Sequence, residues 1–294
     1  MKIILTGSLG NISRPLAINL ISQGHQVTVI SSNNEKSAEI TNLGAVPAIG
    51  SVSDEDFLTT TFKGSDLVYL MVPNDLTASD LKAHIKKTGE HYVNAIQKAN
   101  IKKVVLLSSI GAHLDAGTGP IAGLAAVEKL FRKLSDIDIL FLRPAYFYNN
   151  LYGNIDMIKH MGIIGGNYGA AQEIVLVDPQ DIASIATDKI NEGFNGHQTF
   201  YIASDRRTLK EVAEQLGQAI GKPELPWIEF DDTQSFDGML QAGLSEDMAR
   251  NYVEMGNAVK SAILWEDFDL NKAVPQGKTK LEDFALKFAA AYNG

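Results

Sequence analysis

The clearest chemical signal in the sequence is a short glycine-containing segment near the start of the chain. Gly7 and Gly10 directly follow the apolar run from Lys2 to Thr6 and precede a helical pattern that begins near Pro15. Glycine permits a tight turn here and lets backbone N–H groups approach a phosphate, which the positive end of the helix dipole also attracts. Because a strand, a glycine loop and a helix follow one another, we predict a dinucleotide-binding loop. Its residues are Gly7, Ser8, Leu9, Gly10, Asn11 and Ile12.

Ser13 stands where a third glycine would complete the G-x-x-G-x-x-G pattern. Its small side chain still permits close packing of the helix on the strand. Pro15 lacks an N–H, so it must lie in the first helical turn, where that donor has no partner anyway. An ordinary turn between a strand and a helix is the alternative interpretation of this segment.

The end of the second apolar run, at residues 26–31, indicates which coenzyme fits. NAD sites usually place an Asp or Glu here, where it binds the ribose hydroxyls. This chain has no acid at the tip, and Ser31, Ser32 and Lys36 offer hydroxyls and a positive charge for a 2′-phosphate, although Glu35 opposes that charge. These residues predict that NADP(H) is favoured over NAD(H). The alternative is that these residues form an ordinary turn and do not contact a coenzyme.

Small and polar residues also follow the later apolar runs. Ligands of open parallel sheets bind outside the carboxyl ends of the strands. We therefore expect the cofactor site to be completed by Met71, Val72 and Pro73 after the fourth run, Ser108 and Ser109 after the fifth, and Pro144 after the sixth. Asn74 extends the first of these segments toward the same cleft. For the two serines, hydrogen bonding within a local turn is the alternative.

Aromatic residues beside these positions indicate a pocket for a flat, apolar molecule. Tyr146 and Phe147 come soon after the sixth run, and Tyr168 lies in the glycine-rich stretch at residues 165–169, which we interpret as a flap over the site. The predicted substrate pocket consists of Ile110, Tyr146, Phe147 and Tyr168. Simple core packing is the alternative for Phe147, and an ordinary turn between lobes is the alternative for the flap.

His113 is the candidate catalytic residue. It lies in the loop after the fifth run, and imidazole exchanges a proton near neutral pH. A surface histidine without a catalytic role is the alternative.

These residues must be positioned by regular elements, and short β-branched runs alternate with amphipathic helical segments through the first half of the chain. We expect strands at residues 2–6, 26–31, 46–49, 67–71, 103–108 and 137–142. Helical segments include 15–23, 80–99 and 122–134. Continuous apolar strands that alternate with helices predict an α/β fold of the Rossmann type, a doubly wound parallel sheet with helices on both faces.

After Arg143 and Pro144 the pattern changes. A strand at 173–177, a helix that opens at Asp178 and a strand at 198–203 follow, and from about residue 208 helices predominate. We expect residues 1–150 and about 171–205 to form an NAD(P)-binding Rossmann domain. Residues of about 151–170 and 206–294 are expected to form a smaller, mostly helical lobe on the substrate side.

Composition excludes several classes of protein. The 294 residues carry 26 Lys and Arg against 35 Asp and Glu, a net charge of −9, which argues against direct binding of nucleic acid or of an anionic membrane. The chain has no cysteine, so disulfides and thiolate chemistry are excluded, and its six scattered histidines predict no metal site. No stretch resembles a signal peptide or a membrane span, which predicts a cytoplasmic protein.

Several motifs resemble those of the NmrA-like family of atypical short-chain dehydrogenases/reductases. They are Thr6-Gly7-x-x-Gly10, Gly24-His25-x-Val27, the run from Leu107 to Ala112, Leu142-Arg143-Pro144-x-x-Phe147-x-x-Asn150, and Val177-Asp178-x-x-Asp181-Ile182-Ala183. The resemblance covers most of the chain and weakens after about residue 205. It implies a Rossmann domain that binds NAD(P) and a small C-terminal lobe that closes a substrate cleft. The family includes NAD(P)H-dependent quinone reductases, enzymes that act on small aromatic substrates, and non-catalytic sensors of the nucleotide redox state.

Two departures from the family pattern narrow the chemistry. Relatives that favour NADP often carry an arginine near the position of Ser32, and this chain does not. None of the nine tyrosines has a lysine four residues later, so the Tyr-x-x-x-Lys pair of ordinary short-chain dehydrogenases is absent, and Leu124 stands where many NmrA-like proteins keep a lysine. That tyrosine acts as the general acid/base. Interconversion of ketones and alcohols by the usual mechanism is therefore not expected.

Hydride transfer to a quinone needs orientation and a dry pocket more than a dedicated acid, because the hydroquinone can take its proton from water. We therefore predict an NAD(P)H-dependent oxidoreductase that passes hydride to a quinone or a similar small flat acceptor, with a small molecule as its partner. A non-catalytic NAD(P) redox-sensing regulator that binds another protein is the alternative. Isomerase or reductase action on a small aromatic metabolite is a third option.

Overall fold

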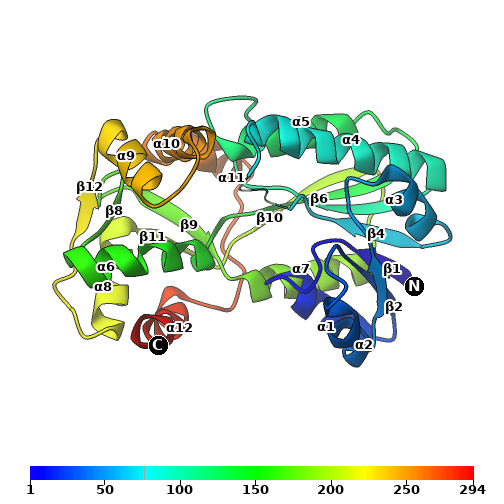
Figure 1. The fold of residues 1–294 in the computed structure, drawn as a ribbon, viewed down its shortest axis with the longest axis horizontal. Helices are drawn as coiled ribbons and strands as arrows, with labels where there is room; N and C mark the ends of the chain where they lie inside the picture. Colours follow the sequence, from blue (N-terminus) through cyan, green and yellow to red (C-terminus); the bar gives the residue numbers. More distant parts are fainter. Residues whose placement is uncertain (74, 76) are drawn as a thin grey trace.

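A seven-stranded parallel sheet forms the centre of the computed structural model, which describes residues 1–73, 75 and 77–294 (Figure 1). The strand order is β10-β6-β5-β4-β1-β2-β3, and every neighbouring pair runs parallel. The strands are β1 (Lys2–Leu5), β2 (Gln26–Ser31), β3 (Val46–Ile49), β4 (Leu67–Leu70), β5 (Lys103–Leu107), β6 (Asp138–Pro144) and β10 (His197–Ile202). The order reverses between β1 and β4, which confirms the predicted doubly wound sheet.

Helices cover both faces of this sheet, as Figure 1 shows. On one face lie α1 (Ser13–Ser22), α2 (Lys36–Asn42) and α7 (Pro179–Glu192), and on the other α3 (Glu55–Phe62), α4 (Leu81–Ala99) and α5 (Pro120–Phe131). Successive strand residues contribute to the two cores in turn: Ile3 and Leu5 pack with one set of helices and Ile4 with the other. Burial on both faces explains why the central strands are continuously apolar rather than alternating.

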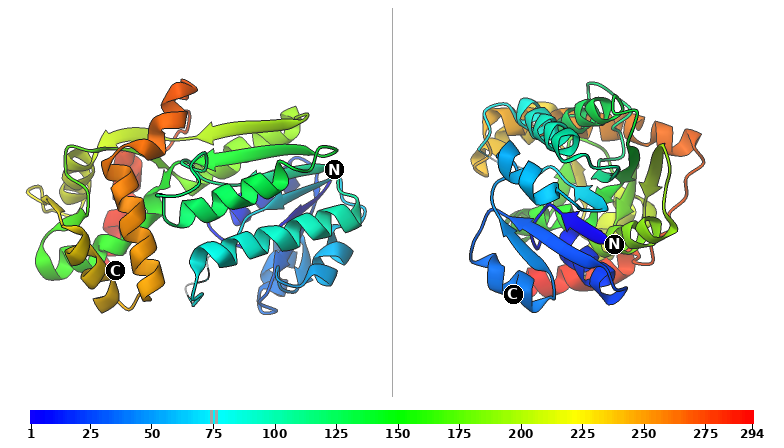
Figure 2. Two further views of the ribbon diagram at one scale, coloured as in Figure 1. Left: turned by 90° about the horizontal axis from the view of Figure 1, so that it is seen from above. Right: turned by 90° about the vertical axis from the view of Figure 1, so that its right-hand side faces the viewer.

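The remaining elements form a second group of short strands and helices, at the end of the molecule away from the N-terminus (Figures 1 and 2). A three-stranded sheet has the order β11-β9-β7, and β8 pairs with β12. These short strands are β7 (Tyr146–Phe147), β8 (Ile164–Gly166), β9 (Glu173–Val177), β11 (Asp205–Thr208) and β12 (Trp227–Glu229). The helices here are the 3₁₀ helices η1 (Tyr148–Asn154) and η2 (Ile263–Trp265), and α6 (Ile155–Met161), α8 (Leu209–Ala219), α9 (Asp232–Gln241), α10 (Glu246–Lys260), α11 (Glu266–Leu270) and α12 (Leu281–Asn293).

The predicted strands of the main sheet and the strand at 173–177 are confirmed within one or two residues at their ends. The helical character of the C-terminal region is confirmed as well. The short strands β7, β8, β11 and β12 were not predicted, because two to four residues carry too little periodicity and their pairing depends on distant partners. Within the described residues, no helix is both long and apolar enough to cross a membrane.

The C-terminal helix α12 packs back onto the segment that follows the main sheet. The Phe284 ring stacks on Tyr148 of η1 with 4.9 Å between centroids, and Phe288 is fully buried beside it. Lys287 of the same helix forms an ion pair of 2.9 Å with Asp178, whose carboxylate also caps the start of α7. The end of the chain thereby holds η1 and α7 in place.

Phe284→Ala should lower the free energy of unfolding by about 3–5 kcal/mol, because truncating a fully buried aromatic ring loses burial and leaves a cavity. Leu286→Ala on the same helix is the matched control: Leu286 is 70% exposed against 1% for Phe284, so its loss should cost less than about 0.5 kcal/mol. Urea unfolding monitored by circular dichroism measures both values. Equal costs for the two variants would contradict the packing of α12 described here.

Candidate functional site

Five neighbouring strands, β6-β5-β4-β1-β2, end at the same edge of the main sheet because they all run parallel. The residues predicted to bind the cofactor follow these ends, so the fold aligns them along one edge. They are the loop from Gly7 to Ile12 after β1, Ser31 and Ser32 at the end of β2, Met71 to Pro73 after β4, Ser108 and Ser109 after β5, and Pro144 at the end of β6. Lys36 begins α2, one short turn beyond β2. Asn74 lies outside the described residues.

The glycine loop is a compact turn between β1 and α1. Gly7 has φ +90°, a conformation that glycine adopts without strain, and the Gly10 N–H donates to the Gly7 carbonyl at 3.1 Å. A Cβ on Gly7 would lie 2.6 Å from the Ser13 hydroxyl oxygen and 2.8 Å from Cγ of Met71. The buried Ser13 hydroxyl donates to the Thr6 carbonyl at 2.9 Å. Serine at the third position of the motif therefore fastens the helix to the end of the strand.

The start of α1 has the features that a phosphate needs. Among the described residues, the N–H groups of Asn11 and Ile12 have no hydrogen-bond partner, and the helix has neither a side-chain cap nor an acid in its first turn. Free donors at the positive end of a helix dipole attract an anion. At Gly10, a Cβ would lie 3.1 Å from the Gly7 carbonyl, so a larger side chain would crowd this turn. The loop therefore fits the pyrophosphate of a dinucleotide.

Two sets of polar side-chain contacts lie around the end of β2 and the start of α2. The Ser8 hydroxyl donates to Ser31 Oγ at 2.9 Å, which links the glycine loop to the strand end. Lys36 Nζ lies 2.9 Å from Glu39, and the Arg14 guanidinium contacts the same carboxylate. Two cations therefore share one acid beside the exposed Ser32. Sequence reasoning did not single out Arg14, although it follows Ser13 directly in the motif.

A cavity of about 550 Å³ adjoins this edge, between the ends of β5 and β6 and the C-terminal elements, a size typical of small-molecule sites. It brings together three predicted cofactor residues, Ser108, Ser109 and Pro144, with all four predicted substrate residues, which are Ile110, Tyr146, Phe147 and Tyr168. Sequence reasoning missed the walls contributed by the C-terminal region, namely Trp227, Met239, Met248, Tyr252, Met255 and Trp265. They occur in segments without a recognisable motif, and only the folding of β12, α9, α10 and η2 against the sheet edge places them here.

Helix α5 presents an apolar face to this cavity through Pro120, Ile121 and Leu124. This is the helix on which ordinary short-chain dehydrogenases would carry their tyrosine and lysine. The residues that α5 contributes to the cavity are hydrocarbon and include no titratable group.

Behind the cavity, a buried ion pair holds Ser108. The Ser108 hydroxyl donates to Glu128 at 2.7 Å, and Glu128, 2% exposed, also accepts from Arg143 Nε at 2.9 Å and Nη2 at 2.8 Å. Arg143 reaches Asp267 at 3.0 Å and the Tyr201 hydroxyl at 2.9 Å. Burial opposes the charge on Arg143, but the hydrogen bonds and charge of Glu128 outweigh it and raise the pKa of the guanidinium. The guanidinium therefore stays charged, and its hydrogen bonds to Glu128 fix the carboxylate that holds Ser108.

His113 lines a different cavity, of about 840 Å³, together with Glu128, Arg132, Arg143 and Asp267. The structure therefore does not bring it together with Tyr146 and Phe147. Burial lowers the pKa of His113, which favours the neutral imidazole, and neither ring nitrogen has a partner among the described residues. Its catalytic role stays a prediction. Within residues 1–73, 75 and 77–294, no cluster of three or more His, Asp or Glu side chains could hold a metal ion.

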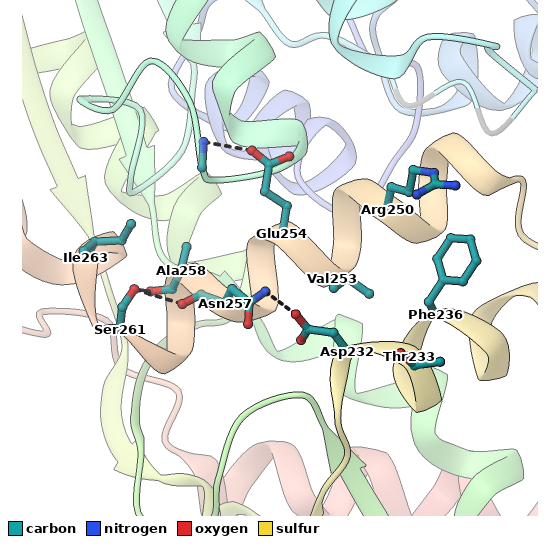
Figure 3. Close-up of a pocket in the computed structure, with 11 residues that line it drawn as sticks. Asp232, Thr233, Phe236, Arg250, Val253, Glu254, Asn257, Ala258, Ser261 and Ile263 are labelled. Atoms are coloured by element: carbon teal, nitrogen blue, oxygen red, sulfur yellow. Dashed lines mark hydrogen bonds between the residues drawn. The ribbon is translucent and has the colours of Figure 1, made fainter.

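A third cavity, of about 640 Å³, opens between α9 and α10 (Figure 3). Asp232, Phe236 and Arg250 line it with Glu254, which accepts a hydrogen bond from the Gly117 N–H at 2.8 Å. None of the predicted site residues lines this cavity.

The sheet, the glycine loop and the adjoining cavity define a Rossmann-type nucleotide-binding protein. The chain belongs to the NAD(P)H-binding family, whose sequence profile matches residues 7–174, and this confirms the NmrA-like resemblance. It is 22% identical over 98% of its length to the photosystem II assembly factor Ycf39 of Trieres chinensis, covering 92% of that protein. A shorter match, 33% identical, joins 23% of the chain to 20% of a decarboxylating sterol-4-alpha-carboxylate 3-dehydrogenase from Dictyostelium discoideum.

Solved structures share the whole fold. An NADPH-dependent quinone oxidoreductase from Escherichia coli superposes with a TM-score of 0.79 at 20% identity, covering 96% of this chain and 98% of the other. The Citrobacter sp. triphenylmethane reductase, complexed with NADP(H), gives 0.79 at 21% identity and covers 98% of this chain and 100% of its own. At this identity the likeness establishes the fold.

Gly10→Val should weaken binding of NADPH and NADH by more than about tenfold, because its methyl groups would crowd the turn and the approach of the pyrophosphate to α1. Isothermal titration calorimetry measures the affinity, and far-UV circular dichroism should stay nearly unchanged. Gly238→Val is the matched control, since Gly238 lies in α9 with open space around its Cα, and it should bind like the wild type. Unchanged affinity in Gly10→Val would contradict the assignment of this loop.

Proposed function

We propose that this protein is an NAD(P)H-dependent oxidoreductase that reduces a quinone or another small flat acceptor. One observation carries the proposal: a single cavity joins Ser108, Ser109 and Pro144, at the ends of β5 and β6, to the aromatic walls Tyr146 and Phe147. In a doubly wound fold the reactive end of a dinucleotide reaches this part of the sheet edge, so an acceptor in the cavity would lie against it. The coenzyme, when bound, supplies the hydride.

The chain's own residues provide binding, orientation and exclusion of water. The glycine loop offers its N–H groups to the pyrophosphate, and Ser108, held by Glu128, presents its oxygen at the inner end of the cavity. The rings of Tyr146, Phe147 and Trp227 match a planar acceptor. We infer that residues of about 151–170 and 206–294 act as the substrate-side lobe, supported by the pairing of β8 with β12.

The apolar face of α5 favours a quinone over a ketone. Reduction of a ketone generates an alkoxide, a strong base that ordinary dehydrogenases neutralise with the tyrosine of that helix. A reduced quinone is a far weaker base and can take its proton from water. The structural likeness to an NADPH-dependent quinone oxidoreductase and to a triphenylmethane reductase supports this choice.

We further propose that NADP(H) is the preferred coenzyme. No carboxylate lies at the tip of β2 to bind ribose hydroxyls. Arg14 and Lys36, which both contact Glu39, are the cations near this strand end that a 2′-phosphate could engage, while Glu39 and Glu35 balance their charge. The NADPH and NADP(H) complexes among the structural neighbours are consistent with this preference.

A non-catalytic NAD(P)-sensing regulator is the second candidate. It is favoured by the full-length similarity to an assembly factor, a protein named for assembly rather than for catalysis. Absence of turnover together with tight coenzyme binding would support it.

Purified protein should oxidise NADPH with simple benzoquinones and naphthoquinones and should be inactive on secondary alcohols and simple ketones. The loss of coenzyme absorbance, followed with both panels and with both coenzymes, measures this. Gly10→Val provides the background rate. Turnover of ketones alone would overturn the proposed chemistry.

Ser32→Asp should shift the preference from NADPH toward NADH by about fivefold or more, because a carboxylate near the 2′-phosphate repels it by on the order of 1 kcal/mol. Ser32→Asn keeps the size without the charge and should leave the ratio of the two affinities near its wild-type value. Titration of each variant with NADPH and NADH gives the ratios. A wild-type protein that binds NADH more tightly than NADPH would refute the interpretation of this strand end.

A further inference from the structure

The loop after β8 contributes Asn167 and Tyr168 to the lining of the 550 Å³ cavity. Asn167 is only 3% exposed, although asparagine side chains usually lie at the surface. Its Nδ2 donates to the Asp232 carboxylate at 2.9 Å and to the Val253 carbonyl at 3.0 Å. Asp232 lies in α9 and Val253 in α10, so one amide group joins the loop to both helices.

Helix α10 leaves room for this amide. A Cβ on Gly256 would lie 1.8 Å from Asn167 Oδ1, so a side chain at this position would displace the amide. The next residue, Asn257, donates from its Nδ2 to Asp232 Oδ2 at 2.9 Å (Figure 3). Both carboxylate oxygens of Asp232 therefore accept a hydrogen bond, one from each asparagine. A buried network in which the donors are satisfied favours a single arrangement, and losing one partner leaves a costly unpaired group.

The same loop carries an aromatic pair. The Tyr168 ring stacks on Trp227 with 5.6 Å between centroids, and Trp227 Nε1 donates to the Tyr168 carbonyl at 2.8 Å. Both residues line the 550 Å³ cavity. Trp227 belongs to β12, where it pairs with Ile164 of β8. The loop, the two rings and β12 are thus one connected unit, which Asn167 joins to α9 and α10.

We propose that Asn167 is a positioning residue for the acceptor: it holds the stacked rings of Tyr168 and Trp227 in place, so that the site favours flat acceptors over bulky ones. The inference rests on the proposed function and adds to it the shape of acceptor that is preferred. A wall that is ordered before binding spares the ligand the entropic cost of ordering it, which raises the affinity for a molecule that fits. The same wall does not retreat from a thicker molecule, so it discriminates by shape.

The alternative for residues 165–169 is a flap that opens and closes in each catalytic cycle. A flap would have to break the hydrogen bonds of Asn167 each time, and loosening it would change kcat when opening limits turnover. A fixed wall acts on binding, so loosening it changes the KM of the acceptor. The split between the two kinetic constants therefore separates the two roles.

The first test displaces the amide from the side of α10 without altering the loop. In Gly256→Ala, the KM for duroquinone, a flat tetramethylated quinone, should rise about three- to tenfold, with kcat within about threefold and NADPH affinity within about twofold of the wild type. The preference in kcat/KM for duroquinone over 2,6-di-tert-butyl-1,4-benzoquinone, whose substituents project on both sides of the ring, should fall by about fivefold. Gly238→Ala in α9, where a Cβ meets open space, is the matched control and should keep wild-type values.

A mere loss of folded protein would lower both rates equally and leave the KM and the preference unchanged. That outcome in Gly256→Ala, or a change confined to kcat, would overturn the inference.

A reciprocal exchange tests the contact itself. Asn167→Asp keeps the size of the side chain but removes both donors and sets a carboxylate against Asp232, so it should reproduce the rise in KM. Adding Asp232→Asn restores an amide donor with the two partners exchanged, and the KM for duroquinone should return to within about threefold of the wild type. A double variant no better than Asn167→Asp alone would refute the role of this hydrogen bond.

A binding measurement keeps the inference testable apart from turnover. The chain has two tryptophans, Trp227 and Trp265, and both line the cavity, so a quinone that enters it should quench their fluorescence. Duroquinone titrated into the NADP⁺-saturated protein should bind about three- to tenfold more weakly in Gly256→Ala and Asn167→Asp than in the wild type or Gly238→Ala. If this holds while the wild type reduces no quinone, the proposed function fails and the role of Asn167 stands. If the wild type reduces duroquinone but all variants bind it equally, the inference fails and the proposed function stands. A wild type that does not bind duroquinone refutes both.

Discussion

The parallel direction of all seven strands in the main sheet is the constraint on which the site depends. Because the strands run the same way, the loops that follow β1, β2, β4, β5 and β6 emerge at one edge, and residues far apart in sequence become neighbours there. The topology also reverses between β1 and β4, which leaves room for a ligand between their loops. Both faces of such a sheet must be covered, and this requirement explains the continuous apolar strands and the two separate cores.

The buried pair of Glu128 and Arg143 connects this edge to the C-terminal region. Glu128 belongs to α5 and Arg143 to β6, while Asp267 on α11 takes the remaining side of the guanidinium. An ion pair removed from water costs desolvation energy, which good geometry and additional hydrogen bonds must offset. Here the Glu128 carboxylate also accepts a hydrogen bond from the Ser108 hydroxyl. The buried ion pair therefore fixes the orientation of the Ser108 side chain at the edge of the cavity, at the cost of desolvation.

The cavity itself combines two kinds of surface. Pro120, Ile121 and Leu124 of α5 contribute hydrocarbon to the lining, and Tyr146 and Tyr168 contribute aromatic rings. A flat acceptor in the cavity would have its ring in a largely apolar environment. In a typical short-chain dehydrogenase the helix that follows β5 supplies both the base and the orientation. In this protein the tyrosines that line the cavity come from the segments that follow β6.

The sequence by itself determined the strands of the main sheet, the glycine loop, the NAD(P)-binding family and the missing Tyr-x-x-x-Lys pair. These features are local: periodicity, turn residues and spacing act within one strand–helix unit. Only the tertiary structure decided that His113 lines a different cavity from Tyr146, that Arg14 and Lys36 share Glu39, and that Tyr146, Tyr168 and Trp227 line one cavity. Each of these facts depends on contacts between separate elements. Those contacts are set by the strand order, by the pairing of β7, β8 and β12, and by the packing of α10. No local sequence pattern encodes them.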